Sequence, residues 1–165
     1  MQEHHDLKGR LTLLLHDDAG RLVHTQQPRN RIVLSGRSLV ARLFAGISGG
    51  TPPTQVTHMA LGSDATPAAD GQTALLAERA PRRAISEVSY LDFDEPDGGG
   101  GSTRRVRATL KAVFDFADAN DPAVPLREAA IFTDATAGVM YNRVVFEPVT
   151  KTNAFKLTLL WDVTF

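Results

Sequence analysis

Residues 153–165, Asn-Ala-Phe-Lys-Leu-Thr-Leu-Leu-Trp-Asp-Val-Thr-Phe, indicate the fold class more clearly than any other stretch of the chain. Every second position is apolar, and the intervening positions are mostly polar; the apolar set is Phe155, Leu157, Leu159, Trp161, Val163 and Phe165. A strict period of two is typical of a β-strand with one face in a core and the other largely in water. A terminus is normally frayed unless it is tied into a sheet, so we predict a long strand that is central in its sheet.

A second stretch, residues 105–116, alternates in the same way. Its apolar positions from Val106 to Phe116 are predicted to face the core, and Arg105 and Arg107 to face outward. The large inward side chains Leu110, Phe114 and Phe116 complete the expected core together with the apolar residues of the C-terminal strand. Burial of each large apolar side chain contributes about 1.5–3 kcal/mol, so these two strands supply a major part of the stability.

Further apolar runs predict strands at residues 11–16, 21–26, 56–61, 83–94, 126–132 and 139–146. The first two are separated by Asp17-Asp18-Ala19-Gly20, a turn sequence that favours a β-hairpin. Residues 83–94 carry apolar side chains on both faces, which indicates either a β-bulge or burial of both faces. Four consecutive glycines within residues 96–102 predict a flexible hairpin tip.

One helix is predicted, with Ser35 as its N-cap and Gly46 at its end. Its apolar residues recur at three- and four-residue spacing; they are Leu39, Val40, Leu43 and Phe44. Residues 64–83 contain too few large apolar side chains to form core, so we expect an external loop with one helical turn at residues 73–78.

Short strands at close spacing, one helix and no βαβ rhythm are typical of all-β folds. The chain is therefore predicted to be an antiparallel β-sandwich, or a flattened barrel, of about eight strands with one short α-helix. Residues 30–165 are assigned to this body. Residues 1–29 are assigned to an N-terminal arm and hairpin extension that contacts a neighbour.

The length and composition of the chain fit one globular domain without covalent cross-links. The chain has 165 residues, of which 42% are hydrophobic and 22% charged, a net charge of −1 and no cysteine. The lack of cysteine excludes disulfides, iron–sulfur clusters and thiolate zinc sites, and the near-zero charge gives no support to nucleic-acid binding. The first residues lack a signal-peptide pattern and no apolar run approaches 18 residues, so we expect a cytosolically made chain that does not span a membrane.

Few residues offer chemistry. His4, His5 and Asp6 could ligate a metal, although a solvated tail is the more frequent case. Residues 92–98 superficially resemble a calcium loop, but Pro96 occupies the fifth position, where an oxygen donor is required. The acidic residues at 115, 118 and 121, or the acidic turn itself, leave a calcium site of another kind open. No nucleophile or phosphate motif is present, so we predict no catalytic residue, metal, cofactor or small-molecule substrate.

Two basic clusters, Arg82-Arg83 and Arg104-Arg105-Arg107, flank the same predicted hairpin and could meet in space. At a near-neutral net charge they are predicted to be interface or salt-bridge residues and not a nucleic-acid groove.

Arg143 is expected to point inward, next to Phe146. A buried cation without a partner is too costly to tolerate, so Arg143 requires an acidic side chain close by. Glu128 is the predicted partner.

A set of short segments follows a recognisable order over residues 30–165. They are Asn-Arg-Ile-Val-Leu-Ser-Gly-Arg at 30–37, Leu-Phe-Ala-Gly at 43–46, Met-Ala-Leu-Gly-Ser-Asp-Ala-Thr-Pro at 59–67, Thr-Ala-Leu-Leu-Ala-Glu at 73–78, Glu-Ala-Ala-Ile-Phe at 128–132, Met-Tyr-Asn-Arg at 140–143, Phe146, Pro-Val-Thr-Lys at 148–151 and Leu-Leu-Trp-Asp-Val-Thr-Phe at 159–165. This order resembles a group of small tail-associated structural proteins of bacteriophages and related contractile injection particles. The chain departs from the group at Ser63 and Ala130, where glycine is more usual.

The resemblance implies a non-enzymatic structural component, present in multiple copies, that links neighbouring tail components at a collar, cap, baseplate or fibre attachment. The implied partners are copies of itself and other tail, tube, collar or baseplate proteins, without a membrane or direct nucleic-acid recognition. The implied location is the virion or a tail-like particle assembled in the bacterial cytoplasm. The residues also leave open a carbohydrate- or cell-surface-binding β-sandwich that uses exposed aromatics such as Tyr90 or Tyr141.

Assembly agrees with the strand pattern. A long, apolar, flat terminal strand would favour aggregation if it were a free edge. We therefore expect copies of the chain or other neighbours to cover such edges.

Overall fold

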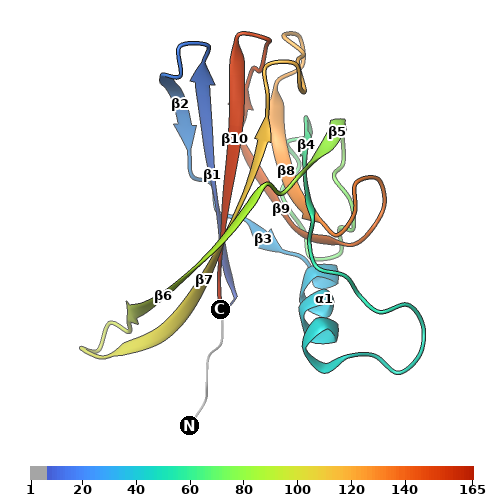
Figure 1. Ribbon diagram of the computed structural model, residues 1–165, viewed down its shortest axis with the longest axis vertical. Coiled ribbons are helices and arrows are strands. Elements are labelled where there is room, and N and C mark those ends of the chain that lie inside the picture. Colours follow the sequence, from blue (N-terminus) through green and yellow to red (C-terminus); the bar gives the residue numbers. More distant parts are fainter. Residues whose placement is uncertain (1–6) are drawn as a thin grey trace.

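The C-terminal strand lies at the centre of one of two five-stranded antiparallel sheets (Figure 1) in the computed structural model, which describes residues 7–165. The first sheet has the order β2-β1-β10-β7-β6, and its strands are Leu22–Gln26, Lys8–Asp17, Phe155–Thr164, Ser102–Phe114 and Glu87–Pro96. The second has the order β3-β9-β8-β4-β5, formed by Arg31–Ile32, Met140–Val149, Leu126–Phe132, His58–Gly62 and Glu78–Ala84. One helix, α1, spans Leu34–Ala45. The predicted all-β antiparallel sandwich is confirmed.

The register of β10 explains the alternation in its sequence. Trp161 lies opposite Leu11 of β1 and Leu110 of β7, so the three side chains form one row across the sheet. The next rows are Leu13, Leu159 and Ala112, then Leu15, Leu157 and Phe114, and all nine residues are buried. These rows pack against Met59, Leu61, Ala129, Ile131 and Val144 of the second sheet to form the main core.

Three predicted core residues lie at the margins of this core. Phe155 is half-buried at the start of β10, and Phe116 is half-buried beyond the end of β7. Phe165 is 45% exposed, although its backbone exchanges two hydrogen bonds with Val106. The prediction that all three belong to the buried core is wrong, because the period of two continues past the point where the second sheet covers the first.

Near the beginning of β7, the face predicted to be buried is exposed and the face predicted to be exposed is buried. Val106, predicted to be inward, is 41% exposed, whereas Arg105, predicted to be outward, is buried. The β6–β7 hairpin curves away from the rest of the sandwich and forms an arm (Figure 1). The arm lacks a second sheet against its inner face, so the pattern of burial set by the sandwich does not hold there.

The single strand predicted at residues 83–94 is two strands in two sheets. The N–H of Ile85 donates to Thr57 beside β4, and the N–H of the next residue, Ser86, donates to Lys111 of β7. The chain thus crosses from the second sheet to the first between these residues. Apolar side chains on both faces of β6 are largely exposed, with Val88 at 47% and Leu91 at 54%, so the expectation of two buried faces is wrong.

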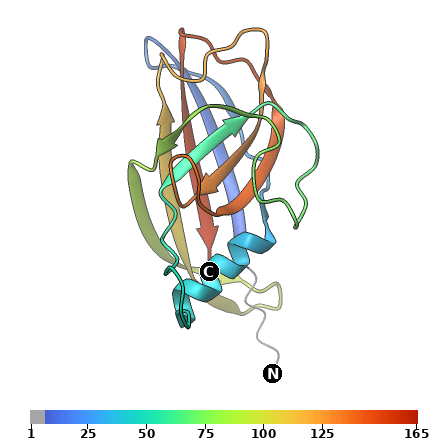
Figure 2. The same ribbon diagram turned by 90° about the vertical axis from the view of Figure 1, so that its right-hand side faces the viewer.

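Helix α1 lies at the same end of the sandwich as the tip of the arm (Figure 2). It begins at Leu34, with Val33 at the N-cap position and no side-chain cap; Ser35 instead donates its hydroxyl to the Met140 carbonyl at 2.7 Å. The prediction of Ser35 as N-cap is therefore wrong, whereas Gly46, with φ of 76°, ends the helix as predicted. Only Gly36 and Leu39 of the helix are buried.

Residues 8–26 are not an extension of the sandwich. They form β1 and β2 of the first sheet, and Leu11, Leu13 and Leu15 of β1 belong to the core. The division into an N-terminal extension and a body starting at residue 30 does not match the structure.

The loop before β5 contributes to a second apolar cluster, on the face of the second sheet turned away from the first. This cluster comprises Val33, Ala60, Leu75, Ala130, Phe132 and Met140. Residues 73–77 form no helical turn, and Leu75 is buried. The expectation of an external loop without core residues is wrong in this part.

Candidate functional site

Arg143 of β9 and Glu128 of β8 form an ion pair within the second sheet. Arg143 Nε donates to Glu128 Oε2 at 2.7 Å, and neither side chain is exposed. Because β8 and β9 are neighbouring strands, the two residues need no loop to bring them together. The structure thus places side by side the two residues that the sequence predicted as partners.

The loop of residues 63–77 covers Arg143 and satisfies its remaining donors. Nη1 donates to the Thr66 carbonyl at 2.8 Å and to Gln72 Oε1 at 3.2 Å, and Nη2 lies 3.5 Å from Asp64 Oδ1. Hydrogen bonds from Thr66 and the charge of Arg143 lower the pKa of Asp64 below its usual value. The guanidinium therefore holds the first part and the middle of a loop that has no regular structure of its own.

Glu128 holds the same loop from the other side. Its carboxylate accepts the backbone N–H groups of Ala77 at 2.8 Å and Leu76 at 3.2 Å. Gly62 packs directly against it, and a Cβ at this position would overlap the carboxylate and the Ala77 carbonyl. Hydrogen bonds to the charged form allow the carboxylate to be buried.

Four of the segments that carry the resemblance meet at this ion pair: residues 59–67, 73–78, 128–132 and 140–143. The pair has no solvent-accessible surface, so it cannot contact a dissolved substrate without opening of the loop. Its arrangement fixes the loop on the sheet.

The two predicted arginine clusters lie on different sheets and do not meet. Arg82 and Arg83 belong to β5, whereas Arg104, Arg105 and Arg107 belong to β7. Arg82 pairs with Glu78 and stacks over the Phe132 ring, 3.5 Å from its centroid; Arg83 pairs with Asp118.

The arginines of β7 are engaged within the arm. Arg105 contacts Glu95 at 3.1 Å and Arg104 contacts Asp94 at 3.4 Å, both across the β6–β7 ladder. Arg107 lies over the Phe93 ring, 4.5 Å from its centroid. Five arginines that were grouped from the sequence thus serve two separate parts of the fold, and an interface role for them stays a prediction.

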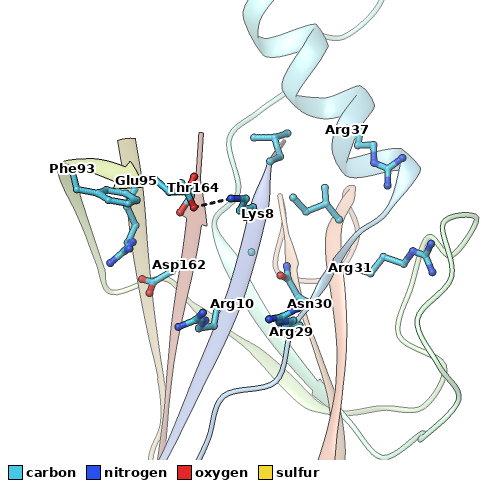
Figure 3. A pocket seen from close by; sticks show the side chains of 14 residues that line it. Lys8, Arg10, Arg29, Asn30, Arg31, Arg37, Phe93, Glu95, Asp162 and Thr164 are labelled. Atoms are coloured by element: carbon cyan, nitrogen blue, oxygen red, sulfur yellow. Dashed lines mark hydrogen bonds and ion pairs between the residues drawn. The ribbon is translucent and has the colours of Figure 1, made fainter. Parts of the chain in front are cut away.

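A hollow of about 1050 Å³ surrounds the N-terminal part of β1 (Figure 3). Six cationic side chains line it, against two carboxylates, Glu95 and Asp162; the cations are Lys8, Arg10, Arg29, Arg31, Arg37 and Arg107. They come from β1, from β3 and the segment before it, from α1 and from the arm. The cations are concentrated here although the chain as a whole has a net charge of −1.

Some of these cations have partners within the chain. Lys8 contacts Glu95 at 2.7 Å, and Arg31 and Arg37 share the single carboxylate of Asp70 at 2.8 and 3.4 Å. Within residues 7–165, Arg10 and Arg29 have no carboxylate within 4.0 Å.

Asn30 lies beside these two arginines. Both polar atoms of its side chain are buried and make no hydrogen bond to any described residue. Asn30 packs on Gly9, where a Cβ would overlap the amide group.

This hollow was not predicted from the sequence. Lys8 to Arg37 are spread over several elements, and only the pairing of β1 with residues 28–30 brings them together. The available signal was the local run Arg29-Asn30-Arg31, which contains two cations and no acid.

The two aromatics proposed for sugar binding differ in exposure. Tyr90 on β6 is 74% exposed, but Tyr141 on β9 is buried, and burial raises its pKa to about 12. Tyr141 therefore cannot contribute to a surface platform, and the expectation that it is exposed is wrong.

The acidic residues considered as calcium ligands have other partners. Asp118 and Asp121 lie near Arg83 and Arg79, and Asp94 near Arg104. Over residues 7–165, no group of three His, Asp or Glu side chains is placed to hold a metal ion. His4, His5 and Asp6 lie outside the described residues.

Lys151 is a buried cation near the opposite end of the sandwich. It is 1% exposed, and its Nζ donates to the Asp115 carbonyl at 2.7 Å and to Asn120 Oδ1 at 3.0 Å. Desolvation lowers its pKa to about 8, while the charge of Asp115 acts in the opposite direction. Lys151 anchors the loop that follows β7.

Comparisons with family models, with curated proteins and with solved structures yield no match to this chain. Among the described residues, no helix is long and apolar enough to cross a membrane.

Proposed function

We propose that this chain is a non-enzymatic structural component of a phage or phage-tail-like particle, present in multiple copies and linking neighbouring tail components. The ordered sequence segments support the particle class, since four of them build one buried network that holds a loop on the sandwich. These segments hold the fold together and do not form an open site, which agrees with a structural role. The location proposed is the virion or tail-like particle, at a collar, cap, baseplate or fibre attachment.

The observation that carries the assembly role is the arm. Its outer strand β6 is a free sheet edge of ten residues. Val88 and Tyr90 are exposed on one face and Leu91 on the other. A long free edge with apolar side chains favours pairing with another chain unless something covers it. The C-terminal strand β10 lies in the middle of its sheet and is not a free edge. The long free edge of that sheet is β6.

The helix offers a second uncovered apolar surface at the same end. Phe44 is 94% exposed and Leu43 is 46% exposed. Neighbouring subunits that contact both the arm and α1 would cover Phe44 and Tyr90, the most exposed large apolar side chains among residues 7–165. We therefore propose copies of the chain, together with tube, collar or baseplate proteins, as its partners.

Native mass spectrometry of the protein, alone and co-expressed with the products of its adjacent genes, tests this role. We expect a discrete oligomer or a complex with a tail component. The Tyr90→Lys/Leu91→Lys variant should shift the distribution towards monomer, whereas the matched control Leu76→Lys, an exposed loop position, should not. A monodisperse monomer that binds no neighbouring gene product would contradict the proposal.

Of the two tyrosines considered for a carbohydrate-binding module, Tyr90 is exposed and Tyr141 is buried. The two tyrosines together therefore offer a single exposed ring, which provides little stacking surface for a sugar. A glycan array in which the protein binds defined sugars, and in which Tyr90→Ala abolishes the signal, would favour this alternative over assembly.

A further inference from the structure

Two arginines face each other across a β-bridge in the cationic hollow. Arg10 of β1 is the antiparallel bridge partner of Arg29, and both side chains are exposed. Directly opposite residues in an antiparallel pair have neighbouring Cβ atoms on the same face of the sheet. Figure 3 shows both side chains beside β1, close to Asn30. The fold therefore brings the backbone positions of two arginines together at the mouth of the hollow.

Among residues 7–165, no salt bridge offsets the charges of this pair. Like charges that lie directly opposite in a sheet destabilise it. Asp162 lies opposite Arg10 on the other side of β1, and its Oδ1 accepts the Thr109 hydroxyl at 2.6 Å. Two adjacent guanidinium groups become favourable when a carboxylate or phosphate binds between them, because their fork-shaped donors match these groups.

We propose that this hollow binds an acidic peptide segment of a neighbouring protein subunit. The guanidinium groups of Arg10 and Arg29 would bind one carboxylate, and Arg31 and Arg37, which share a single acid, would attract a second. The amide of Asn30 is buried beneath the two arginines and packs on Gly9, so the exposed guanidinium groups are the contacts offered to the segment. A volume of about 1050 Å³ accommodates several residues of such a segment.

The lining favours a peptide over a nucleic acid. Glu95, Asp162 and the Phe93 ring stand among the cations. A nucleic-acid strand carries a charge at every nucleotide and would bring phosphates against these carboxylates. A peptide can place acids against the arginines and neutral residues elsewhere.

The acidic segment is one chemical feature of a partner in the proposed assembly. The inference rests on the assembly role at one point, namely that the segment belongs to a neighbouring subunit. The peptide assay below and the mass-spectrometric test of assembly use different variants. The peptide assay can therefore fail while mass spectrometry still detects assembly through the arm. Equally, assembly can fail while the hollow still binds the peptide.

The test is fluorescence anisotropy of labelled hexaglutamate titrated with the full chain at low ionic strength, with hexaglutamine as the neutral probe. The Arg10→Gln/Arg29→Gln variant removes the paired guanidinium groups. The control Arg79→Gln/Arg127→Gln removes the same charge from the second sheet, away from the hollow. An oligothymidylate of similar length provides the nucleic-acid comparison.

We expect hexaglutamate to bind and hexaglutamine not to. The hollow variant should bind hexaglutamate about tenfold more weakly or worse, because it loses charge-assisted hydrogen bonds, and the control by less than about twofold. The hollow variant should melt at or above the parent temperature, which separates loss of binding from loss of folding. Three outcomes would overturn the proposal: no binding by the parent, equal losses in both variants, or tighter binding of the oligothymidylate with the same dependence on Arg10 and Arg29.

Discussion

Arg143 determines whether residues 63–77 stay on the second sheet. An Arg143→Met substitution keeps much of the side-chain volume but leaves Glu128 as a buried charge without its cationic partner. Breaking a buried ion pair in this way costs about 3–5 kcal/mol. We therefore expect the free energy of unfolding, measured by urea denaturation at neutral pH, to fall by this amount.

The control for this prediction is the double variant Arg143→Met/Glu128→Gln. Glutamine removes the unpaired charge but can still accept a backbone N–H, from Ala77 or Leu76. Because the two residues are in direct contact, the double variant should lose less stability than the two single variants added together. Additive losses, or an Arg143→Met protein as stable as the parent, would show that the pair does not hold the loop.

The two residues of this pair could be predicted from the sequence because a buried cation requires an acid. The other partners of Arg143 could not, since a backbone carbonyl such as that of Thr66 leaves no signature in the sequence. The Arg10–Arg29 pair was missed for a related reason. It depends on a single bridge between β1 and a segment without regular structure, and hydrophobic periodicity carries no information about such a contact.

Among the elements, α1 depends on a close approach that only glycine permits. A Cβ on Gly36 would overlap the backbone carbonyl of Tyr141 in β9, and a backbone atom cannot move aside as a flexible side chain can. Alanine is favoured over glycine within a helix by about 1 kcal/mol. Overpacking against a fixed neighbour costs about 1–3 kcal/mol, so we expect Gly36→Ala to destabilise the protein in thermal or urea unfolding.

Gly71→Ala provides the matched control. A Cβ on Gly71 would meet no neighbouring atom within 4 Å, and this residue does not require a positive φ, so the substitution should be neutral or slightly stabilising. Faster hydrogen exchange in residues 34–45 of the Gly36→Ala variant alone would locate the effect at the helix. A Gly36→Ala protein as stable as the control would contradict the close packing of α1 on β9.

The elements were predictable where a strand is buried along most of its length, as in β10 and in β8, Leu126–Phe132, which matches the predicted range. The prediction failed at Ile85 and Ser86, because a chain that changes sheets can keep an extended backbone, so its sequence still reads as one strand. The end of α1 at Gly46 was predictable from glycine chemistry. Its start was not, because the Leu34 N–H bonds to the carbonyl of Asp70, distant in sequence.

At the scale of the whole molecule, stability depends on pH through groups at opposite ends of the pH range. Hydrogen bonds and cationic partners lower the pKa values of Asp17, Asp64, Glu95 and Asp134. A lowered carboxyl pKa contributes stability above the ordinary value of about 4, and this contribution is lost as the pH falls through the folded-state pKa. Acid should therefore weaken several loops and, through Glu95, the contact of the tip of the arm with Lys8.

Lys151 acts on the alkaline side. Its pKa is about 8 in the folded protein and about 10.4 in an unfolded chain, so between these values the unfolded state binds the proton and the folded state does not. The free energy of unfolding therefore rises with pH in this range, by up to about 1.4 kcal/mol per pH unit. Below pH 8 both states are protonated, and Lys151 adds no pH dependence.

The prediction is measured as the difference in unfolding free energy between the parent and Lys151→Met, by urea denaturation at several values from pH 7 to 10. The difference should be constant near pH 7 and then change in favour of the parent as the pH rises above 8, because methionine cannot release a proton. Tyr141, with a folded pKa of about 12, lowers stability above about pH 10 in both proteins, so its effect cancels in this difference. Lys156→Met, which removes a more exposed lysine on β10, should show no such change. Parallel curves for the parent and Lys151→Met across the whole range would mean that Lys151 keeps its charge in the folded protein, and that its burial against Asp115 and Asn120 is relieved in solution.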